Sequence, residues 1–318
     1  MPIAANANSK FTMGAAPSIV TGGEARSGSA LLRLARPHQW TKNLLVLTAL
    51  IFSRHLFILH DDLIAILGFF AFCALSSFAY AVNDIMDRDA DRLNPEKRDR
   101  PLARGDLSVA SAARFAGALA AIGLGLSFLI GWAFLLIAFL YVTLQFGYSM
   151  GAKRVVILDV VAVAAGFVLR AYAGGVAIDV EVSPWLVFIT FSLALFLGLA
   201  RRRHELTILG GGAAAHRGAL AQYNIRLIDQ MLAIVAGTTL VGYMIYTASL
   251  EVEEKLGTRY HHLAVLTVPY VAFGILRYLY LVDEQNEGGD PTRLLLKDRQ
   301  LLICMVLWIL TELALLYL

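Results

Sequence analysis

The chain alternates long apolar runs with short polar segments along most of its length. A helix needs roughly 17 to 25 apolar residues to cross a hydrocarbon core of about 30 Å. Nine runs meet that length, although Arg54 and His55 interrupt the far end of the first. The pattern therefore predicts an all-α polytopic membrane protein with nine transmembrane helices. The expected spans are 42–59, 63–83, 107–129, 132–149, 157–178, 184–200, 229–250, 262–283 and 300–318.

The first residues do not share this pattern. Residues 1–27 are rich in Ala, Ser, Gly and Asn, and no basic region followed by an apolar core marks them as a signal peptide. Their composition is typical of a segment that cannot bury enough apolar surface to fold. We therefore expect a disordered tail at 1–27 and one membrane domain at 28–318.

The composition agrees with a membrane protein, because 58% of the residues are hydrophobic and only 16% are charged. Cys73 and Cys304 lie in separate apolar runs, so we interpret both as packing residues. We expect no nucleic-acid partner. The sequence leaves the oligomeric state open, a homo-oligomer included.

The distribution of lysine and arginine predicts the orientation in the membrane. Cations gather before the first run and after the second, fourth, sixth and eighth, whereas the other side receives only Arg54, Lys255 and Arg259. Cytoplasmic loops carry the excess of positive charge. We therefore expect a protein of the inner (plasma) membrane with a cytoplasmic N-terminus and an external C-terminus. The loops rich in polar groups then share the cytoplasmic face and can form one site.

An acidic motif follows the second run. If the helix continues through it, Asp84, Asp87 and Asp91 lie within roughly 60° of one another, with Asn83 beside them and Asp89 pointing away. Grouped carboxylate and amide oxygens suit Mg²⁺, which completes its shell with water and substrate phosphate. The alternative is a solvated acidic helix end, stabilised by the arginines that follow.

Cationic and polar residues accompany this motif in the loops of the same side. Trp40 and Arg36 fit interfacial anchors, whereas other residues are candidate ligands for phosphate groups. The positive-inside rule alone would explain two or three of these cations, but not their position after an acidic cluster. The candidate substrate ligands are Lys42, Asn43, Arg98, Arg100, Tyr148, Lys153, Arg170, Arg201 and Arg202.

Arg170 differs from the others because it lies well inside an apolar run. An intramembrane arginine costs several kcal/mol unless it is paired or hydrated. We expect Asp159 or another carboxylate as its partner, either in a functional site or in an ion pair that only fixes helix packing. Of the three arginines at 201–203, one or two should face the site. The glycine-rich loop at 210–215 fits a lid and lacks a phosphate-loop motif.

These motifs together resemble the UbiA superfamily of intramembrane prenyltransferases. The motif NDxxDxxxD at 83–91 carries the resemblance, which covers the chain from about residue 30 to the end. Within the superfamily, the chain is most similar to the phosphoribosyltransferases that act on decaprenyl phosphate. The supporting segments are RPHQWTKN (36–43), NPEKRDRPLARG (94–105), YSMGAKRVVILD (148–159), GFVLRAYAGG (166–175), RYLYLV (277–282) and LLLKDR (294–299).

The resemblance implies a reaction between phosphoribosyl pyrophosphate (PRPP) and a polyprenyl phosphate in the membrane. Aromatic prenyltransferases of this superfamily carry a second acidic motif after the sixth span, where this chain has Arg201 to Glu205. The acidic cluster would hold Mg²⁺ on the pyrophosphate of PRPP, with Asp84 and Asp87 as catalytic residues. Asp159 would assist the ribosyl cation or pair with Lys153 or Arg170.

Two other functions stay open at this point. One is a true prenyltransferase that moves an isoprenoid from its diphosphate to an aromatic or other acceptor, and the missing second acidic motif argues against it. The other is a transporter, which the absence of an inverted repeat and of paired broken helices disfavours. Phosphoribosyl transfer would begin the synthesis of lipid-linked arabinose for a cell-wall polymer or a secreted nodulation signal, and the residues do not choose between these.

Overall fold

The computed structural model describes residues 23–94, 97–209, 219–284 and 291–317, and every regular element in these ranges is a helix. Within them, eight segments are long and apolar enough to cross a membrane, and they correspond to the second to ninth predicted spans. The chain is therefore a multi-pass membrane protein. The long helices are α3 (Leu59–Met86), α6 (Val109–Ile130), α7 (Trp132–Met150), α8 (Leu158–Ala177), α9 (Pro184–Leu209), α11 (Ile225–Thr247), α13 (Val268–Glu284) with the preceding 3₁₀ helix η5 (His261–Thr267), and α15 (Arg299–Tyr317).

The first predicted span has a different form. A 3₁₀ helix, η1 (Pro37–Leu47), leads into the short α2 (Thr48–Phe52), and the chain then turns at 53–58 with positive φ at Arg54 and Phe57. A 3₁₀ helix rises about 2 Å per residue and an α-helix about 1.5 Å, so the two together extend over about 30 Å. That length matches a hydrocarbon core. The count of nine spans stays a prediction.

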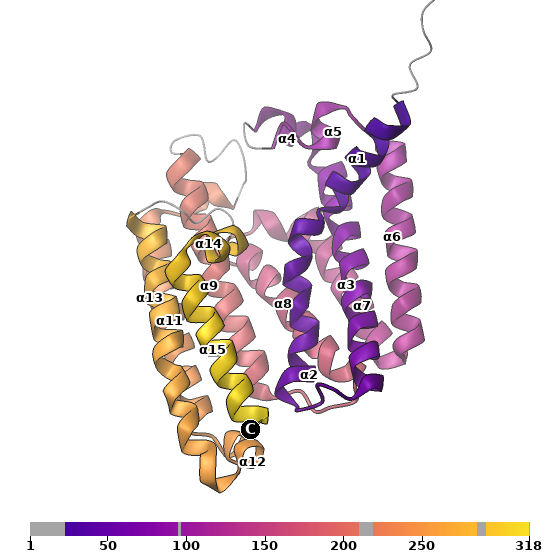
Figure 1. Cartoon of the computed structure of the whole chain (residues 1–318). Helices are drawn as coiled ribbons and strands as arrows, with labels where there is room; N and C mark the ends of the chain where they lie inside the picture. Colours follow the sequence, from indigo (N-terminus) through magenta and orange to yellow (C-terminus); the bar gives the residue numbers. More distant parts are fainter. Residues whose placement is uncertain (1–22, 95–96, 210–218, 285–290, 318) are drawn as a thin grey trace, which may run out of the picture.

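The N-terminal helix α1 (Gly23–Ala35) begins inside the segment expected to be disordered. Residues 23–27 are therefore helical, and residues 1–22 lie outside the described part of the chain. Ala30 and Leu34 of α1 are buried in a cluster with residues of α3 and α6. This packing places the end of α1 beside the polar end of α3 (Figure 1). Arg36, which follows α1, therefore reaches Asp84 near the end of α3.

Helix α8 lies between two groups of helices. Val160, near its start, belongs to an apolar cluster formed with α9, α11 and α13, whereas Ala173, near its end, packs with η1, α3 and α7. Figure 1 shows α9, α11, α13 and α15 on one side and α3, α6 and α7 on the other. Residues of both groups can therefore meet around α8.

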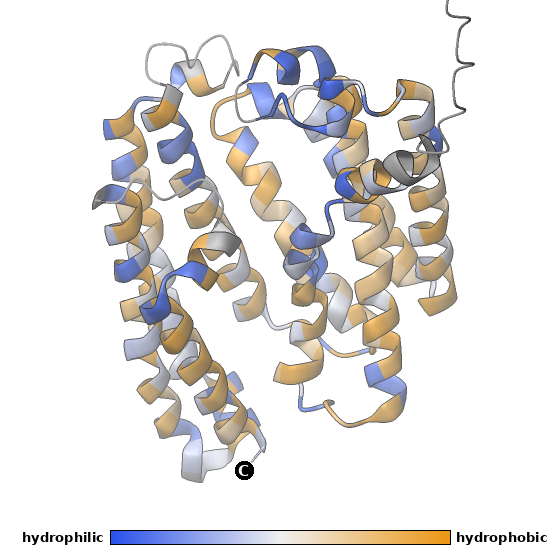
Figure 2. Cartoon of the chain, turned by 45° about the horizontal axis from the view of Figure 1, so that its top comes forward, coloured by the Kyte–Doolittle hydropathy of each residue, from blue (hydrophilic) through white to orange (hydrophobic). Residues whose placement is uncertain are grey.

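Short helices cover the polar end of the bundle. Two of them, α4 (Arg88–Leu93) and α5 (Pro101–Arg104), follow α3 and lie over the helix ends (Figure 1). Figure 2 shows hydrophobic residues along the long helices and hydrophilic residues gathered around α4 and α5. The remaining short elements are η2 (Ala152–Arg154), η4 (Leu220–Gln222), α12 (Leu250–Tyr260) and α14 (Pro291–Lys297).

A close backbone contact joins η1 to α8. A Cβ atom added at Gly174 would lie 2.1 Å from the carbonyl oxygen of Val46. Ala171 and Ala173 beside it are also small and fully buried. Small residues allow helices to approach closely in a membrane, where packing replaces the hydrophobic effect as the attraction between them. Gly174 thus sets the distance between η1 and α8.

We expect Gly174→Ala to destabilise the protein by about 1–3 kcal/mol, the usual cost of overpacking. Gly237→Ala on α11 is the matched control, because a Cβ there meets nothing within 4 Å. Thermal denaturation in detergent, followed by size-exclusion chromatography, measures both variants. A melting temperature lowered equally by the two substitutions, or by neither, would contradict the close contact.

Candidate active site

The acidic motif lies at the polar end of α3, where two guanidinium groups surround its most buried carboxylate. Asp84 is 2% exposed, and its Oδ1 accepts hydrogen bonds from Arg36 Nη2 at 2.6 Å and Arg100 Nη1 at 2.9 Å. Arg100 Nη1 also donates to Asp91 Oδ2 at 2.7 Å. Arg36 is therefore part of the site and not the interfacial anchor that the sequence indicated.

A lysine from another helix end holds the rest of the motif. Lys153, in η2 directly after α7, is 5% exposed. Its Nζ donates to Asp87 Oδ1 at 2.5 Å and to Asn83 Oδ1 at 3.2 Å. The predicted convergence of the loops after α3 and α7 is thus visible in a direct ion pair between Asp87 and Lys153.

The carboxylates expected on one face of an unbroken helix contact different cations. Helix α3 ends at Met86, and Asp87 leaves the helical conformation with φ −96° and ψ 4° before α4 begins. Asp84 and Asp91 then share Arg100, whereas Asp87 turns to Lys153. The assumption of a continuous helix was wrong, because it ignored this break.

Electrostatics keeps the carboxylates and cations together. Burial raises the pKa of the Asp91 carboxyl above its ordinary value, and the positive charges of Arg100 and Lys97 act in the opposite direction. Loss of the Arg100 charge would therefore raise the pKa of Asp91 further. The charge of Arg100 thus favours the ionised form of the buried Asp91 carboxyl.

The donor set fits a magnesium ion by its chemistry. Among the residues that the structure describes, no three Asp, Glu, His or Cys side chains are close enough to hold a metal ion as they stand. Three carboxylates and one amide nevertheless supply the hard oxygen ligands that Mg²⁺ prefers. Arg100 and Lys153 now contact those oxygens. The assignment of Asn83, Asp84, Asp87 and Asp91 to Mg²⁺ stays a prediction.

Arg170 lies below this cluster with neutral partners instead of the expected carboxylate. Its Nε donates to Asn43 Oδ1 at 2.8 Å, its Nη1 to the Gly166 carbonyl at 2.8 Å and its Nη2 to Tyr141 Oη at 2.7 Å. Asn43 is fully buried and also donates to Ser76 Oγ at 3.1 Å. Both residues were candidate substrate ligands. In the structure they belong to an internal hydrogen-bond network that joins η1, α3, α7 and α8.

Asp159 forms a second buried network, with partners other than those predicted. It is fully buried at the start of α8, accepts a hydrogen bond from Tyr223 Oη at 2.9 Å, and lies 2.9 Å from Arg202 Nε in an ion pair. Arg202 also contacts Glu205. Neither Lys153 nor Arg170 pairs with Asp159, because each of them is held elsewhere.

The three consecutive arginines of α9 point in three directions, as expected for neighbours on a helix. Arg201 is half-exposed and contacts Glu205, whereas Arg202 is buried against Asp159. Arg203 donates to Asp229 of α11 at 2.7 Å and to the Val282 carbonyl of α13 at 3.1 Å. Arg203 therefore ties three helices together, and Arg201 is the most accessible of the three.

Tyr80 of α3 marks a cationic region that the sequence did not reveal. The Arg36 guanidinium lies 5.0 Å from the centre of its ring. Lys42, Arg170 and Arg201 are also near enough to its hydroxyl to interact with it electrostatically. Because Tyr80 lies one helical turn before Asp84, the cations and the acidic cluster are neighbours.

The remaining candidate ligands are less buried than Asp84 and Lys153. Arg98 is exposed in the loop before α5, and Tyr148 is half-buried near the end of α7, within the electrostatic reach of Arg202. The predicted lid at 210–215 lies outside the described residues. Acidic oxygens beside a group of cations form an arrangement that can receive both a metal ion and phosphate groups.

Comparisons with known proteins identify the family of the chain. Residues 44–310 match the model of the UbiA prenyltransferase family. The decaprenyl-phosphate phosphoribosyltransferase of Corynebacterium glutamicum is 33% identical over 283 residues, which are 88% of this chain and 84% of that protein. The protein of the same name from Mycolicibacterium smegmatis is 33% identical over 289 residues, covering 88% of this chain and 90% of the relative.

A solved structure shows the same fold. The structure of a UbiA homolog from Archaeoglobus fulgidus, bound to DMAPP and Mg²⁺, has a TM-score of 0.68 at 20% identity and covers 90% of this chain and 99% of that chain. The family model spans most of the sequence, and the curated relatives match along nearly their whole length. The resemblance drawn from the acidic motif is confirmed, and the chain belongs to the UbiA prenyltransferase family.

Proposed function

We propose that the protein transfers the 5-phosphoribosyl group of PRPP to a polyprenyl phosphate, with release of pyrophosphate. Decaprenyl phosphate is the acceptor that the names of both phosphoribosyltransferase relatives indicate. The observation that carries the proposal is one acidic cluster enclosed by cations, with Arg201 to Arg203 where a second acidic motif would be expected. This arrangement suits one metal-bound pyrophosphate and additional phosphate groups.

The acidic cluster would position the leaving group. Mg²⁺, when bound there, would neutralise the pyrophosphate of PRPP. Arg100 and Lys153 lie against the same carboxylates and supply further positive charge beside that pyrophosphate. Asp84 and Asp87 are the ligands on which transfer should depend most. The proposed metal ligands are Asn83, Asp84, Asp87 and Asp91.

The acceptor needs little activation. A phosphate oxygen of the lipid is already anionic, so it can attack C1 of the ribose as the bond from C1 to pyrophosphate breaks, without a strong general base. Catalysis then rests on positioning and on electrostatic stabilisation. Lys42, Arg98 and Arg201 would bind the phosphate groups of the two substrates. Asp159 acts by holding Arg202 in place.

The distribution of charge indicates on which side of the membrane this reaction takes place. The cations Arg36, Arg100 and Lys153 lie at the end of the bundle that carries α4 and α5, which should face the cytoplasm. We therefore infer a protein of the inner (plasma) membrane with the N-terminus and the active site cytoplasmic and the C-terminus outside. The lipid product would be a precursor of lipid-linked arabinose.

The purified protein in detergent tests the reaction directly. With Mg²⁺, decaprenyl phosphate and radiolabelled PRPP, we expect a labelled lipid that EDTA abolishes and excess Mg²⁺ restores. A parallel mixture contains a prenyl diphosphate and 4-hydroxybenzoate. Product only in the second mixture would identify a conventional prenyltransferase and refute the proposal.

Asp84→Asn or Asp87→Ala should lower the transfer rate at least about a hundredfold, because each removes a carboxylate that positions the leaving group. Asp89→Ala is the control within the same motif, since Asp89 is 76% exposed and contacts only Arg88 and Arg92 among the described residues. Initial rates are compared at equal amounts of protein that elutes as one peak. Similar losses for Asp89→Ala and the other two would contradict the assignment.

Two of the three arginines of α9, Arg201 and Arg203, allow substrate binding to be tested separately from stability. Arg201→Ala should raise KM for one phosphate substrate about tenfold with little change in melting temperature, because a half-exposed ion pair contributes little stability. Arg203→Ala should lower the melting temperature and leave KM unchanged, because it removes contacts between α9, α11 and α13. The reverse pattern would show that Arg203 and not Arg201 faces the substrate.

A further inference from the structure

The turn between η2 and α8 contains a strained residue. Ile157, directly before α8, has φ 69° and ψ −45°. These angles are close to those of the rare and strained classic γ-turn, and a positive φ is an outlier for a β-branched residue. The side chain of Ile157 is 48% exposed, so its own packing does little to hold this conformation. Strained residues persist only where their surroundings fix them, and they gather at functional sites.

The hydroxyl group of Tyr223, directly after η4, holds this turn. Tyr223 Oη accepts a hydrogen bond from the Ile157 N–H at 2.7 Å and donates one to Asp159 Oδ1 at 2.9 Å. Burial raises the pKa of the Tyr223 hydroxyl to about 12, so it keeps the proton that it donates to Asp159. The ring of Tyr223 is buried in an apolar cluster with Val160 and Ile228. Tyr223 is therefore fixed at its ring and at its hydroxyl.

The same turn is close in the chain to a lysine of the candidate active site. Lys153 lies in η2, and its Nζ binds Asp87 and Asn83 of the acidic motif. Only three residues separate Lys153 from Ile157. A different backbone direction at Ile157 would therefore move the ammonium group relative to its acceptors.

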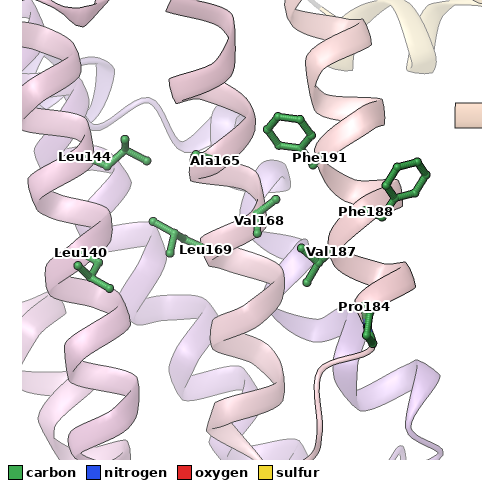
Figure 3. Close-up of a pocket in the computed structure, with 9 residues that line it drawn as sticks. All are labelled: Leu140, Leu144, Ala165, Val168, Leu169, Pro184, Val187, Phe188 and Phe191. Carbon is green, nitrogen blue, oxygen red and sulfur yellow. The ribbon is translucent and has the colours of Figure 1, made fainter. Parts of the chain in front are cut away.

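Asp159 connects the hydroxyl of Tyr223 to a buried arginine. Asp159 Oδ2 lies 2.9 Å from Arg202 Nε, and both residues are buried. Further along α8, every residue that lines the space between α7, α8 and α9 is apolar (Figure 3). That lining offers Asp159 no replacement for the hydroxyl. Its loss would leave the Ile157 N–H and Asp159 Oδ1 without the partner that joins them.

We propose that Tyr223 is a positioning residue for the transfer reaction, because its hydroxyl fixes the turn at Ile157 and thereby places Lys153 against the acidic motif. This inference rests on the proposed function, which takes Lys153 as a cation beside the departing pyrophosphate. Tyr223 acts through Lys153 and not by contact with a substrate. A residue that follows α9 thus controls a lysine that follows α7.

Tyr223→Phe removes the hydroxyl and keeps the buried ring. We expect kcat and kcat/KM for PRPP to fall together at least about tenfold, because misplacing a group that acts in the transition state by about 1 Å costs up to about a hundredfold. Rates are compared for protein that elutes as one peak. An unchanged kcat would overturn the proposal.

Tyr317→Phe is the matched control for this loss of a hydroxyl. Tyr317 Oη donates a hydrogen bond to the Ile51 carbonyl at 3.0 Å. Helix α2 and the end of α15, which carry these two residues, lie at the end of the bundle away from α4 and α5 (Figure 1). Transfer by Tyr317→Phe should match the wild type. An equal loss in the two variants would show that Tyr223 has no special role in positioning and would refute the proposal.

Ile157→Gly distinguishes positioning through the turn from a general loss of stability. Glycine adopts a positive φ without a steric penalty, so the turn then depends less on the hydroxyl. Added to Tyr223→Phe, it should raise kcat at least about fivefold, because relief of such backbone strain is worth at least about that factor. A double variant no more active than Tyr223→Phe would contradict an action of the hydroxyl through this turn.

The position of Lys153 can also be followed without measuring transfer. Its side chain is 6% exposed and paired with Asp87, so it should react slowly with acetic anhydride. In Tyr223→Phe, mass spectrometry should show acetylation of Lys153 about fivefold faster, the change that corresponds to the loss of one ordinary hydrogen bond. Acetylation of Lys255 in α12, at the other end of the bundle, should stay constant (Figure 1). Equal acetylation of Lys153 in the two proteins would overturn the proposal.

The two proposals fail in different ways. A wild-type protein that makes no labelled lipid from PRPP, together with faster acetylation of Lys153 in Tyr223→Phe, would contradict phosphoribosyl transfer and support the placement of Lys153 by Tyr223. Normal transfer by Tyr223→Phe with unchanged acetylation would support the reaction and refute the positioning role.

Discussion

The guanidinium of Arg170 must find hydrogen-bond acceptors inside the apolar part of α8, because a charge at that depth costs about 2.5–3.5 kcal/mol or more when unsatisfied. It finds them in Asn43 of η1, Tyr141 of α7 and the carbonyl of Gly166. Three separate segments are thereby fixed around α8. The close passage of η1 over Gly174 lies one turn away on the same helix, so the buried charge and the small residue act on the same contact.

At the charged end above this network, by contrast, acidic side chains pair with basic ones. There, the carboxylates Asp84 and Asp87 meet the cations Arg36, Arg100 and Lys153, so little net charge is left without a partner. A bound metal ion and a bound phosphate can each replace one member of such a pair at modest electrostatic cost. The Arg170 network below, whose acceptors are all neutral, holds its segments rigidly. The ionic pairs above it can exchange partners when substrate and metal bind.

The sequence predicted the parts of the fold that lipid dictates. A long apolar run has to be a helix in a membrane, so eight spans and the loops that converge at their ends could be anticipated. Hydrogen-bond partners that are distant in the chain could not be anticipated. Asn43 and Arg170 are separated by 127 positions, and spacing cannot reveal that a neutral amide takes the place of a carboxylate. The break at Asp87 escaped notice because nothing in the local pattern marks the end of α3.

The Arg170 network also affects how the protein inserts into the membrane during its synthesis. All of its acceptors, Asn43, Tyr141 and Gly166, precede Arg170 in the chain. They have therefore already left the ribosome when α8 enters the membrane, and the arginine can be satisfied as soon as its helix is inserted. The Arg170 network does not need α9 to α15, whereas Asp159 at the start of α8 finds its partners only in α9 and the later Tyr223. The order of the residues along the chain thus allows the buried arginine to be satisfied before the second half of the protein is inserted.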